Sequence, residues 1–465
     1  MAATSVLRVR HRLAELAEAH DVPGASVSVF ADGEVVDAAV GTVNLRTGVE
    51  VRPDSPFMIQ SITKVWTATL VMQLVDEDLV ALDEPITRYL PGFRTADRPA
   101  SAGITVRHLL THTGGFEGDL WAATTTDDDA LKLFVDEHVS RATQYLEPGR
   151  AYSYCSAGLG VLGRLVEALR GTTYAVALRR YLTDPLGVDE VAFDAGEAMG
   201  FRTAIGHVRP GPGEPLRTLP TWAVLPLSNP AAGNQLAMPA RGLIEFAQMH
   251  LADGRAPRGA RLLSAESARM MRTPQVAVPA TFGGPVDQGL GWRLTAAGRV
   301  AEHGGDAPGC AAMLRLVPDR QVAVAVLGNG GDMTGLVSTL CDELLSELAG
   351  VAPRVLGSVP HQTAVDDPDR YCGRYELRNR VAEVSTDDQR RLWLTQEERN
   401  EAAWMSMLAG IDSRPETFEL RRVEGGRFAR LDREGEMAGV VEFIDTDSMG
   451  RARFLHDGRA APRVD

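Results

Sequence analysis

The first 350 residues carry strand-like segments at both ends and helix-like segments between them. Residues 25–30 (ASVSVF) and 34–40 (EVVDAAV) flank the turn Ala31-Asp32-Gly33, which is typical of a β-hairpin. Strand patterns return at 289–294, 299–303, 311–317 and 321–328. Burying both groups most simply requires one antiparallel sheet, built from the two ends of this region and covered by helices.

The residues between these strands have helical periodicity and predict a second, all-helical lobe. Helical patterns lie at 62–78 and near 105–112, 129–139, 156–170, 173–182 and 240–252. An N-terminal helix and an amphipathic one over 334–349 would cover the sheet. The expected fold class is α/β in the α+β arrangement: an antiparallel sheet flanked by helices, plus the helical lobe.

After residues 351–366, which have the composition of a linker, the pattern changes. Residues 367–465 hold 17 arginines and 21 acidic residues, and apolar and charged residues alternate. This pattern is typical of a small antiparallel β-barrel or sandwich with one wet face per strand. We therefore expect a first domain over 1–350, a linker over 351–366 and a C-terminal β-barrel domain over 367–465.

The charge balance disfavours nucleic acid as a partner. The chain has 48 basic and 62 acidic residues, a formal net charge of −14, and such a surface repels phosphate backbones. The N-terminal segment alternates charged and apolar residues, unlike a signal peptide, and no apolar run approaches a membrane span. We expect a cytoplasmic protein without a membrane or nucleic-acid partner, and the sequence leaves the oligomeric state open.

The four cysteines form no metal or redox motif. Cys155, Cys310, Cys341 and Cys372 lie far apart, with no C-x-x-C pair, so zinc and thioredoxin-like chemistry has no support. We expect them to be reduced, buried small residues, and we expect no cofactor and no metal.

Lysine is scarce in this chain. Of the 48 basic residues 46 are arginine, and only Lys64 and Lys132 carry an amine. Codon bias in a high-GC genome explains the scarcity most simply. Chemistry that needs a titratable amine nevertheless has only these two side-chain candidates.

The first motif is residues 61–64 (SITK), at the start of the apolar helical segment. Because three residues make almost one helical turn, Ser61 and Lys64 lie on one face. A serine at a helix N-terminus is near free N–H groups that suit a developing oxyanion, and a desolvated amine beside it can accept its proton. The alternative is a plain cap serine with a solvated lysine.

The second motif is residues 148–156 (PGRAYSYCS), just before a helix. Tyr154 can act as a base if a cation lowers its pKa, and a polar residue two positions on can hold a substrate amide. The alternative is a buried tyrosine, with Ser156 capping a helix from about residue 157.

The third motif is residues 303–306 (HGGD), at the end of a strand pattern. The glycines would let a substrate lie against the strand backbone, where an N–H group can complete an oxyanion hole. The alternative is a tight turn.

In this order, the three motifs resemble the serine β-lactamase and penicillin-binding-protein superfamily, in its branch of class C β-lactamases, DD-peptidases and esterases. That branch carries S-x-x-K, then Y-x-N, then K-T-G or H-x-G. Residues 82–85 (LDEP), 104–115 (ITVRHLLTHTGG) and 314–319 (LRLVPD) add to the resemblance, which covers about residues 8–350. The C-terminal part resembles the lipocalin-like β-domain that some members append.

The resemblance implies a role for each matching residue. Ser61 would be the acylated nucleophile, Lys64 and Tyr154 the proton-transfer pair, and His303 the counterpart of the K-T-G lysine. The backbone N–H groups of Ser61 and Asp306 would form the oxyanion hole.

Two departures from the family pattern affect substrate binding. The expected substrate-binding residues are Ser156, Gly304, Gly305, Asp306 and Asn234. Ser156 stands where relatives have an asparagine, and a shorter hydroxyl cannot bridge both the lysine and a substrate amide. Residues 231–235 (AAGNQ) stand where relatives have a glycine pair and an aspartate, which implies a remodelled pocket wall.

Three functions are compatible with these motifs. The first is a serine hydrolase acting on an ester or amide of a small molecule or peptide. The second is an acyltransferase or peptide cyclase that passes the acyl group to an amine or hydroxyl. The third is a non-catalytic binding protein. Trp121, Trp222 and Met238 are candidates for an apolar pocket or, equally, for the core.

Overall fold

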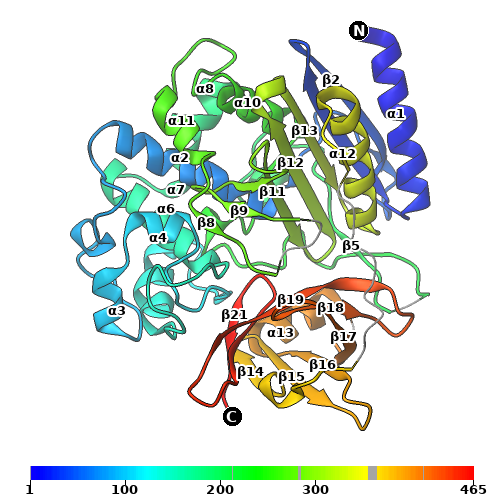
Figure 1. Ribbon diagram of the computed structural model, residues 1–465. Helices are drawn as coiled ribbons and strands as arrows, with labels where there is room; N and C mark the ends of the chain where they lie inside the picture. The colour runs from blue at the N-terminus through cyan, green and yellow to red at the C-terminus, as the bar shows by residue number, and fades with distance from the viewer. Residues whose placement is uncertain (1, 212, 281–283, 354–363, 412) are drawn as a thin grey trace.

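The computed structural model describes residues 2–211, 213–280, 284–353, 364–411 and 413–465. Two large antiparallel sheets organise the molecule (Figure 1). The first has nine strands in the order β3-β2-β1-β13-β12-β11-β10-β9-β8, and the second has eight strands, β14 to β21, in chain order. The first sheet therefore joins strands from the two ends of the first 350 residues, which confirms the expected fold class.

The N-terminal hairpin and β13 are neighbours in the first sheet. Ala25 of β1 faces Gly328 of β13, and both turn residues of the hairpin, Asp32 (φ 52°) and Gly33 (φ 78°), are left-handed. Such a turn matches the twist of the paired strands. The strands of this sheet are β1 (Gly24–Ala31), β2 (Glu34–Asn44), β3 (Val49–Glu50), β8 (Val276–Ala277), β9 (Asp287–Gln288), β10 (Arg293–Thr295), β11 (Val300–Ala307), β12 (Cys310–Val317) and β13 (Val322–Gly328).

Alternate residues of the central strands pack into different cores. In β13, Val324 and its i±2 neighbours pack with α1 (Ala2–Ala19) and α12 (Met333–Ala349), whereas Ala325 and its neighbours pack toward the helical lobe. Figure 1 shows α1 and α12 together on one face. Because both faces are covered, β13 is apolar throughout. β1 carries two buried serines, Ser26 and Ser28, and Ser28 donates to Asp37.

The middle of the chain forms the expected helical lobe, with two short two-stranded pairs beside it. Its α2 is buried on nearly every side and runs through the lobe's core. The helices are α2 (Thr63–Asp76), α3 (Arg98–Gly103), α4 (Val106–Leu110), α5 (Ala130–Leu133), α6 (Ser156–Arg170), α7 (Tyr174–Leu178), α8 (Asp184–Leu186), α9 (Ala195–Ala198), α10 (Ala240–Leu251) and α11 (Ala265–Met271). The strand pairs are β4 (Phe57–Met58) with β7 (Ala237–Met238), and β5 (His207–Val208) with β6 (Arg217–Thr218).

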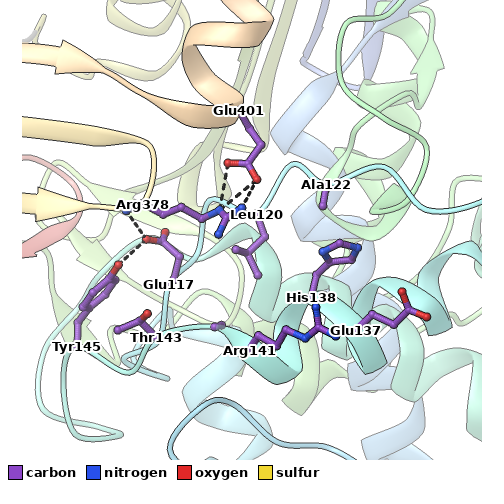
Figure 2. A pocket seen from close by; sticks show the side chains of 11 residues that line it. Glu117, Leu120, Ala122, Glu137, His138, Arg141, Thr143, Tyr145, Arg378 and Glu401 are labelled. Atoms are coloured by element: carbon purple, nitrogen blue, oxygen red, sulfur yellow. Dashed lines mark hydrogen bonds and ion pairs between the residues drawn. The ribbon is translucent and has the colours of Figure 1, made fainter.

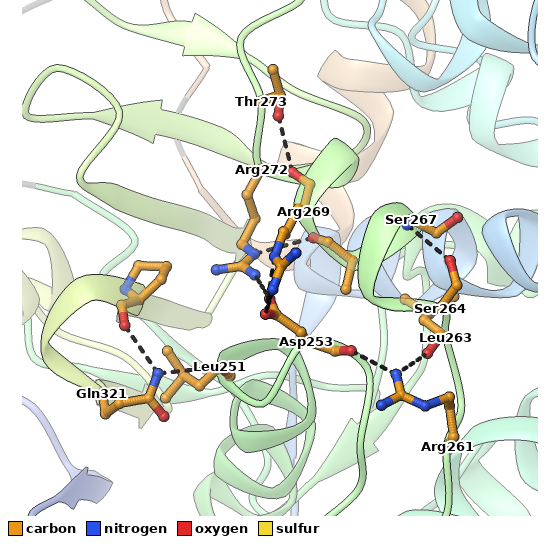
Figure 3. A network of polar contacts seen from close by, with 12 residues as sticks. Leu251, Asp253, Arg261, Leu263, Ser264, Ser267, Arg269, Arg272, Thr273 and Gln321 are labelled. Carbon is orange, nitrogen blue, oxygen red and sulfur yellow. Dashed lines mark hydrogen bonds and ion pairs between the residues drawn. The ribbon is translucent and has the colours of Figure 1, made fainter.

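One carboxylate fixes α11 to the end of α10. Asp253 accepts hydrogen bonds from Arg269 and Arg272, and its backbone carbonyl accepts one from Arg261 (Figure 3). Arg272 is nearly buried. The loop between the two helices is therefore held by charge-assisted bonds in addition to its buried Ala256 and Leu263.

The C-terminal sheet is a nearly closed barrel. An isolated bridge between Tyr375 and Arg463 brings the first strand beside the last, and Tyr371, Phe428 and Phe443 pack edge to face inside. Its elements are β14 (Gly373–Leu377), β15 (Arg380–Thr386), β16 (Leu392–Glu398), α13 (Asn400–Ala409), β17 (Glu416–Glu424), β18 (Arg427–Leu431), β19 (Met437–Thr446), β20 (Ala452–His456) and β21 (Ala460–Pro462).

Several sequence expectations remain predictions. The expected linker, 351–366, lies mostly outside the described residues, so the domain boundaries are untested. Within the part of the chain that the structure describes, no helix is long and apolar enough to cross a membrane. The cytoplasmic location also stays a prediction. The four cysteines are unpaired as expected, but Cys372 is only half-buried.

Candidate active site

The nucleophile candidate lies in a tight turn that leads into α2. Ser61 occupies a 3-10 turn, Gln60–Ile62, and Gln60 before it has a left-handed φ of 48°. Two glycines let other segments approach this turn. A Cβ on Gly233 would lie 1.8 Å from the Gln60 carbonyl oxygen, and one on Gly305 would lie 2.1 Å from that of Ile59. The backbone on both sides of Ser61 is therefore tightly enclosed.

Lys64 lies one turn beyond Ser61 and is buried. Its Nζ donates to Ser61 Oγ at 2.9 Å and to the carbonyl of Ala232 at 2.9 Å, and it lies 5.0 Å from the centre of the Tyr154 ring. Burial, with the nearby Arg459 cation, lowers the pKa of Lys64 to about 7. A large share of this amine is thus neutral near pH 7, when it can accept a proton.

Tyr154 reaches the same site from the segment before α6. Burial raises the pKa of its phenol to about 12, although a hydrogen bond with Ser61 and the Arg459 cation act in the opposite direction. The neighbouring cations therefore offset only part of the effect of burial. Tyr154 is protonated at neutral pH and can donate a proton.

His303, on β11, is 3% exposed and neutral. Burial and then Lys64 lower its pKa to about 3, and its Nδ1 lies 2.7 Å from the carbonyl oxygen of Gly304. Gly304, Gly305 and Asp306 continue β11 past the nucleophile turn, and Asp306 is exposed and opposite Ala311. The alternative interpretation of these residues as a tight turn is therefore wrong, because they belong to strand β11.

The other two expected substrate residues are Ser156, two positions after Tyr154, and Asn234, two positions after the Ala232 whose carbonyl accepts from Lys64. Ser156 is the first residue of α6 and is half-buried, while the buried Asn234 donates its side-chain amide to the Pro226 carbonyl. The suggestion that Ser156 caps α6 is wrong. Cys155 is the cap, because its Sγ accepts the Gly158 N–H at 3.3 Å. Met238 is fully buried in the core, and Trp121 and Trp222 are partly exposed.

The C-terminal barrel contributes a residue that the motifs do not indicate. Arg459, between β20 and β21, lies with its guanidinium 5.0 Å from the Tyr154 ring centre. Asp119 pairs with it and accepts a 2.9 Å bond from its Nη2. The same turn accepts the Tyr154 N–H at the Gly458 carbonyl, at 3.0 Å. No local pattern links two residues 340 positions apart, so sequence reasoning missed this contact.

A pocket of about 480 Å³ marks the same junction between lobe and barrel (Figure 2). The buried Glu117 accepts bonds from the Tyr145 hydroxyl and from the backbone N–H of Arg378, whose guanidinium pairs with Glu401 of α13. Glu117 also accepts the Asp119 N–H at 2.9 Å. The segment 117–119 is therefore held by the barrel on one side and borders the site on the other.

Arg293, on β10, was also missed. Its charge acts on Tyr154 and His303, yet its buried Nε has no hydrogen-bond partner among the described residues. Over the same ranges no three His, Cys, Asp or Glu side chains are grouped as a metal ion would require. The groups gathered at this place are one serine hydroxyl, one amine, one phenol, one imidazole and flanking arginines.

The chain is similar to penicillin-binding proteins and to related amidases. Residues 9–338 match the Beta-lactamase family. Penicillin-binding protein 4 of Amycolatopsis lactamdurans is 39% identical over 370 residues, which is 79% of this chain and 96% of that protein. SurE has a TM-score of 0.77 at 27% identity, covering 99% of both chains, and the structure of SurE with D-Leu has a TM-score of 0.75 at 26% identity, covering 99% of this chain and all of that one.

D-amino acid amidase from Ochrobactrum anthropi, complexed with L-phenylalanine amide, has a TM-score of 0.61 at 25% identity and covers 74% of this chain and 99% of its own. The family match spans most of the chain, and the residues of all three motifs meet at one place in the structure. The chain belongs to the beta-lactamase family.

Proposed function

We propose that this protein is a serine hydrolase that cleaves an ester or amide through an acyl-enzyme on Ser61. The observation that carries the proposal is the 2.9 Å contact between Ser61 Oγ and the buried Lys64 amine, whose pKa is lowered to about 7. A neutral amine at that distance can act as the general base for the hydroxyl.

The first half-reaction assigns one role to each group. As Ser61 Oγ attacks the carbonyl carbon, its proton passes to Lys64, and the oxyanion is bound by the N–H groups of Ser61 and Asp306. The phenol of Tyr154 then protonates the leaving alkoxide or amine, and the Lys64 ammonium returns its proton to Tyr154. His303 stays neutral and lies on strand β11, beside the acyl group.

Water completes the second half-reaction. A water molecule attacks the acyl carbon, and the Tyr154–Lys64 pair accepts a proton from it. The pair then gives a proton to Ser61 Oγ, which leaves as a hydroxyl. The positive charge of Arg293, which acts on Tyr154 and His303, supports a substrate with a carboxylate, such as a peptide end. Such a group would gain a charge-assisted bond on binding.

A second candidate is transfer of the acyl group to an amine, as in peptide cyclisation. Two observations favour it: the barrel turn at Gly458 and Arg459 lies against Tyr154, and SurE, whose structure with D-Leu is known, matches the chain over nearly its whole length. A barrel beside the site offers a surface that could hold an acceptor in place of water.

Intact-mass measurement after treatment with a fluorophosphonate tests the hydrolase proposal. We expect one adduct on the wild type and none on Ser61→Ala. Absence of an adduct on folded wild-type protein would defeat both enzyme proposals.

An activated acyl thioester distinguishes the two candidates. A wild-type acyl-enzyme that water discharges supports hydrolysis. An adduct that persists in water and is discharged by an added amino-acid amide supports transfer.

A further inference from the structure

His112 lies directly behind Tyr154, although it belongs to a segment about forty residues earlier in the chain. It is 1% exposed, and its ring centre is 4.6 Å from that of Tyr154 at an interplanar angle of 32°. Tyr152 contacts the same imidazole edge to face, at 5.7 Å. The phenol ring of Tyr154 therefore has a rigid aromatic support.

The same residue binds the backbone on both sides of Tyr154. The His112 carbonyl accepts the Ser153 N–H at 2.9 Å, and its Nδ1 accepts the Cys155 N–H at 3.1 Å. Only a neutral imidazole can accept at Nδ1, and its proton is then on Nε2. Burial, with Lys64 and His303 nearby, lowers the pKa of His112 well below its usual value, which keeps that bond intact.

The backbone of His112 is itself unusual. Its φ is 56°, in the left-handed region that a residue with a Cβ seldom adopts. Such a conformation is unfavourable and persists only where the surroundings fix it. Here it turns the carbonyl and the imidazole of one residue toward successive N–H groups of the 153–155 segment.

We propose that His112 is the positioning residue for Tyr154: it fixes the backbone before and after this tyrosine and supports its ring, so that the phenol keeps facing Ser61. His112 acts through Tyr154 and does not itself touch the reacting atoms. The inference rests on the proposed function only in that Tyr154 transfers a proton during acylation.

Two substitutions separate the two contacts. His112→Phe keeps an aromatic ring behind Tyr154 but removes the acceptor for Cys155. His112→Asn keeps a short acceptor and tolerates a left-handed backbone but removes the ring. The readout is the single-turnover rate of Ser61 acylation by an alkyl ester, whose alkoxide leaving group needs the proton of Tyr154. Intact mass follows the acyl-enzyme for each variant, with and without Tyr154→Phe.

We expect each variant to acylate at least about tenfold more slowly, since small misplacements of a reacting group cost that much or more. The loss should fall to within about twofold in the Tyr154→Phe background, as coupling between the two residues requires. Equal losses in both backgrounds would overturn the inference. His250→Phe, which replaces a buried histidine in a different aromatic cluster, should acylate at the wild-type rate.

The design keeps this inference separate from the proposed function. No acylation of the wild type would defeat the function, whereas additive losses would defeat only the role of His112. If His112→Phe fails to fold, the double-mutant cycle of His112→Asn with Tyr154→Phe tests the inference. Thermal unfolding shows whether each variant is folded, and the difference between the losses in the two backgrounds measures positioning.

Discussion

The role proposed for Lys64 requires a lysine, although almost all basic residues of this chain are arginine. Arginine stays charged in proteins and cannot release a proton to restart a catalytic cycle. Lys64 is buried next to Ser61 with its pKa lowered to about 7, whereas Lys132 is exposed and pairs with Asp136 at 2.7 Å. The second lysine is therefore a surface residue.

The acylation rate of Ser61 should rise with pH, with a midpoint at about 7. The base is the neutral amine, and the folded-state pKa of Lys64 is lowered to about 7. The active fraction is therefore small below this pH and nearly complete above it. Burst kinetics with p-nitrophenyl acetate from about pH 5 to about pH 9 would measure the midpoint.

Two lysine substitutions serve as the comparison. Lys64→Arg should lose acylation at every pH, and Lys132→Arg should keep both the rate and the midpoint. A flat profile for the wild type would contradict the role of Lys64 as the base.

Sequence patterns predict contacts between residues that are close together in the chain. The three-residue spacing of Ser61 and Lys64 predicts their contact, because a helical turn brings such residues together. The alternative in which Ser156 caps α6 is wrong because the cap is Cys155, whose weak sulfur acceptor is not one that capping preferences favour. The periodicity of apolar residues predicts a helix but does not indicate which residue caps it.

At the scale of elements, strand patterns predict the long strands β1, β2, β11, β12 and β13, but not the two-residue strands β3, β8 and β9. The turn at Asp32 and Gly33 and the apolar runs near 322–328 indicate a hairpin and a strand buried on both faces. The pattern at 303–306 was harder to interpret, since glycines favour turns in most contexts. Here they extend β11, because the strand must pass within contact distance of the Ile59 carbonyl.

Gly305→Ala should damage the site more than Gly304→Ala. A Cβ on Gly305 meets the Ile59 carbonyl oxygen at 2.1 Å and backbone must move, whereas one on Gly304 first meets the flexible end of Met313 at 3.2 Å. Pushing β11 away from the nucleophile turn should cost about 1–3 kcal/mol of unfolding free energy and slow acylation by about 10²-fold. Chemical denaturation and burst kinetics on both variants would measure this, and equal effects would contradict the close approach.

At the scale of the whole molecule, the barrel packs against the segments that border the candidate active site. It binds the 117–119 segment through Arg378 and Asn379 and the 152–154 segment through His456 and Gly458. Alternation of apolar and charged residues predicts the barrel but not the surface on which it packs. The packing surface is set by contacts between residues far apart in the chain, such as Asp119 and Arg459, which come together only in the folded protein.

Replacing Arg459 by methionine should move the pH midpoint of acylation upward. The guanidinium lowers the pKa of Lys64, and its removal also leaves Asp119, which raises that pKa, without this partner. Both effects favour the ammonium, so the midpoint should rise by about half a unit to one unit. Arg150→Met is the matched control, because it removes another lobe–barrel ion pair, to Asp445 at 2.9 Å, that does not contact Tyr154. An unchanged midpoint in folded Arg459→Met would show that the barrel's charge does not reach the catalytic amine.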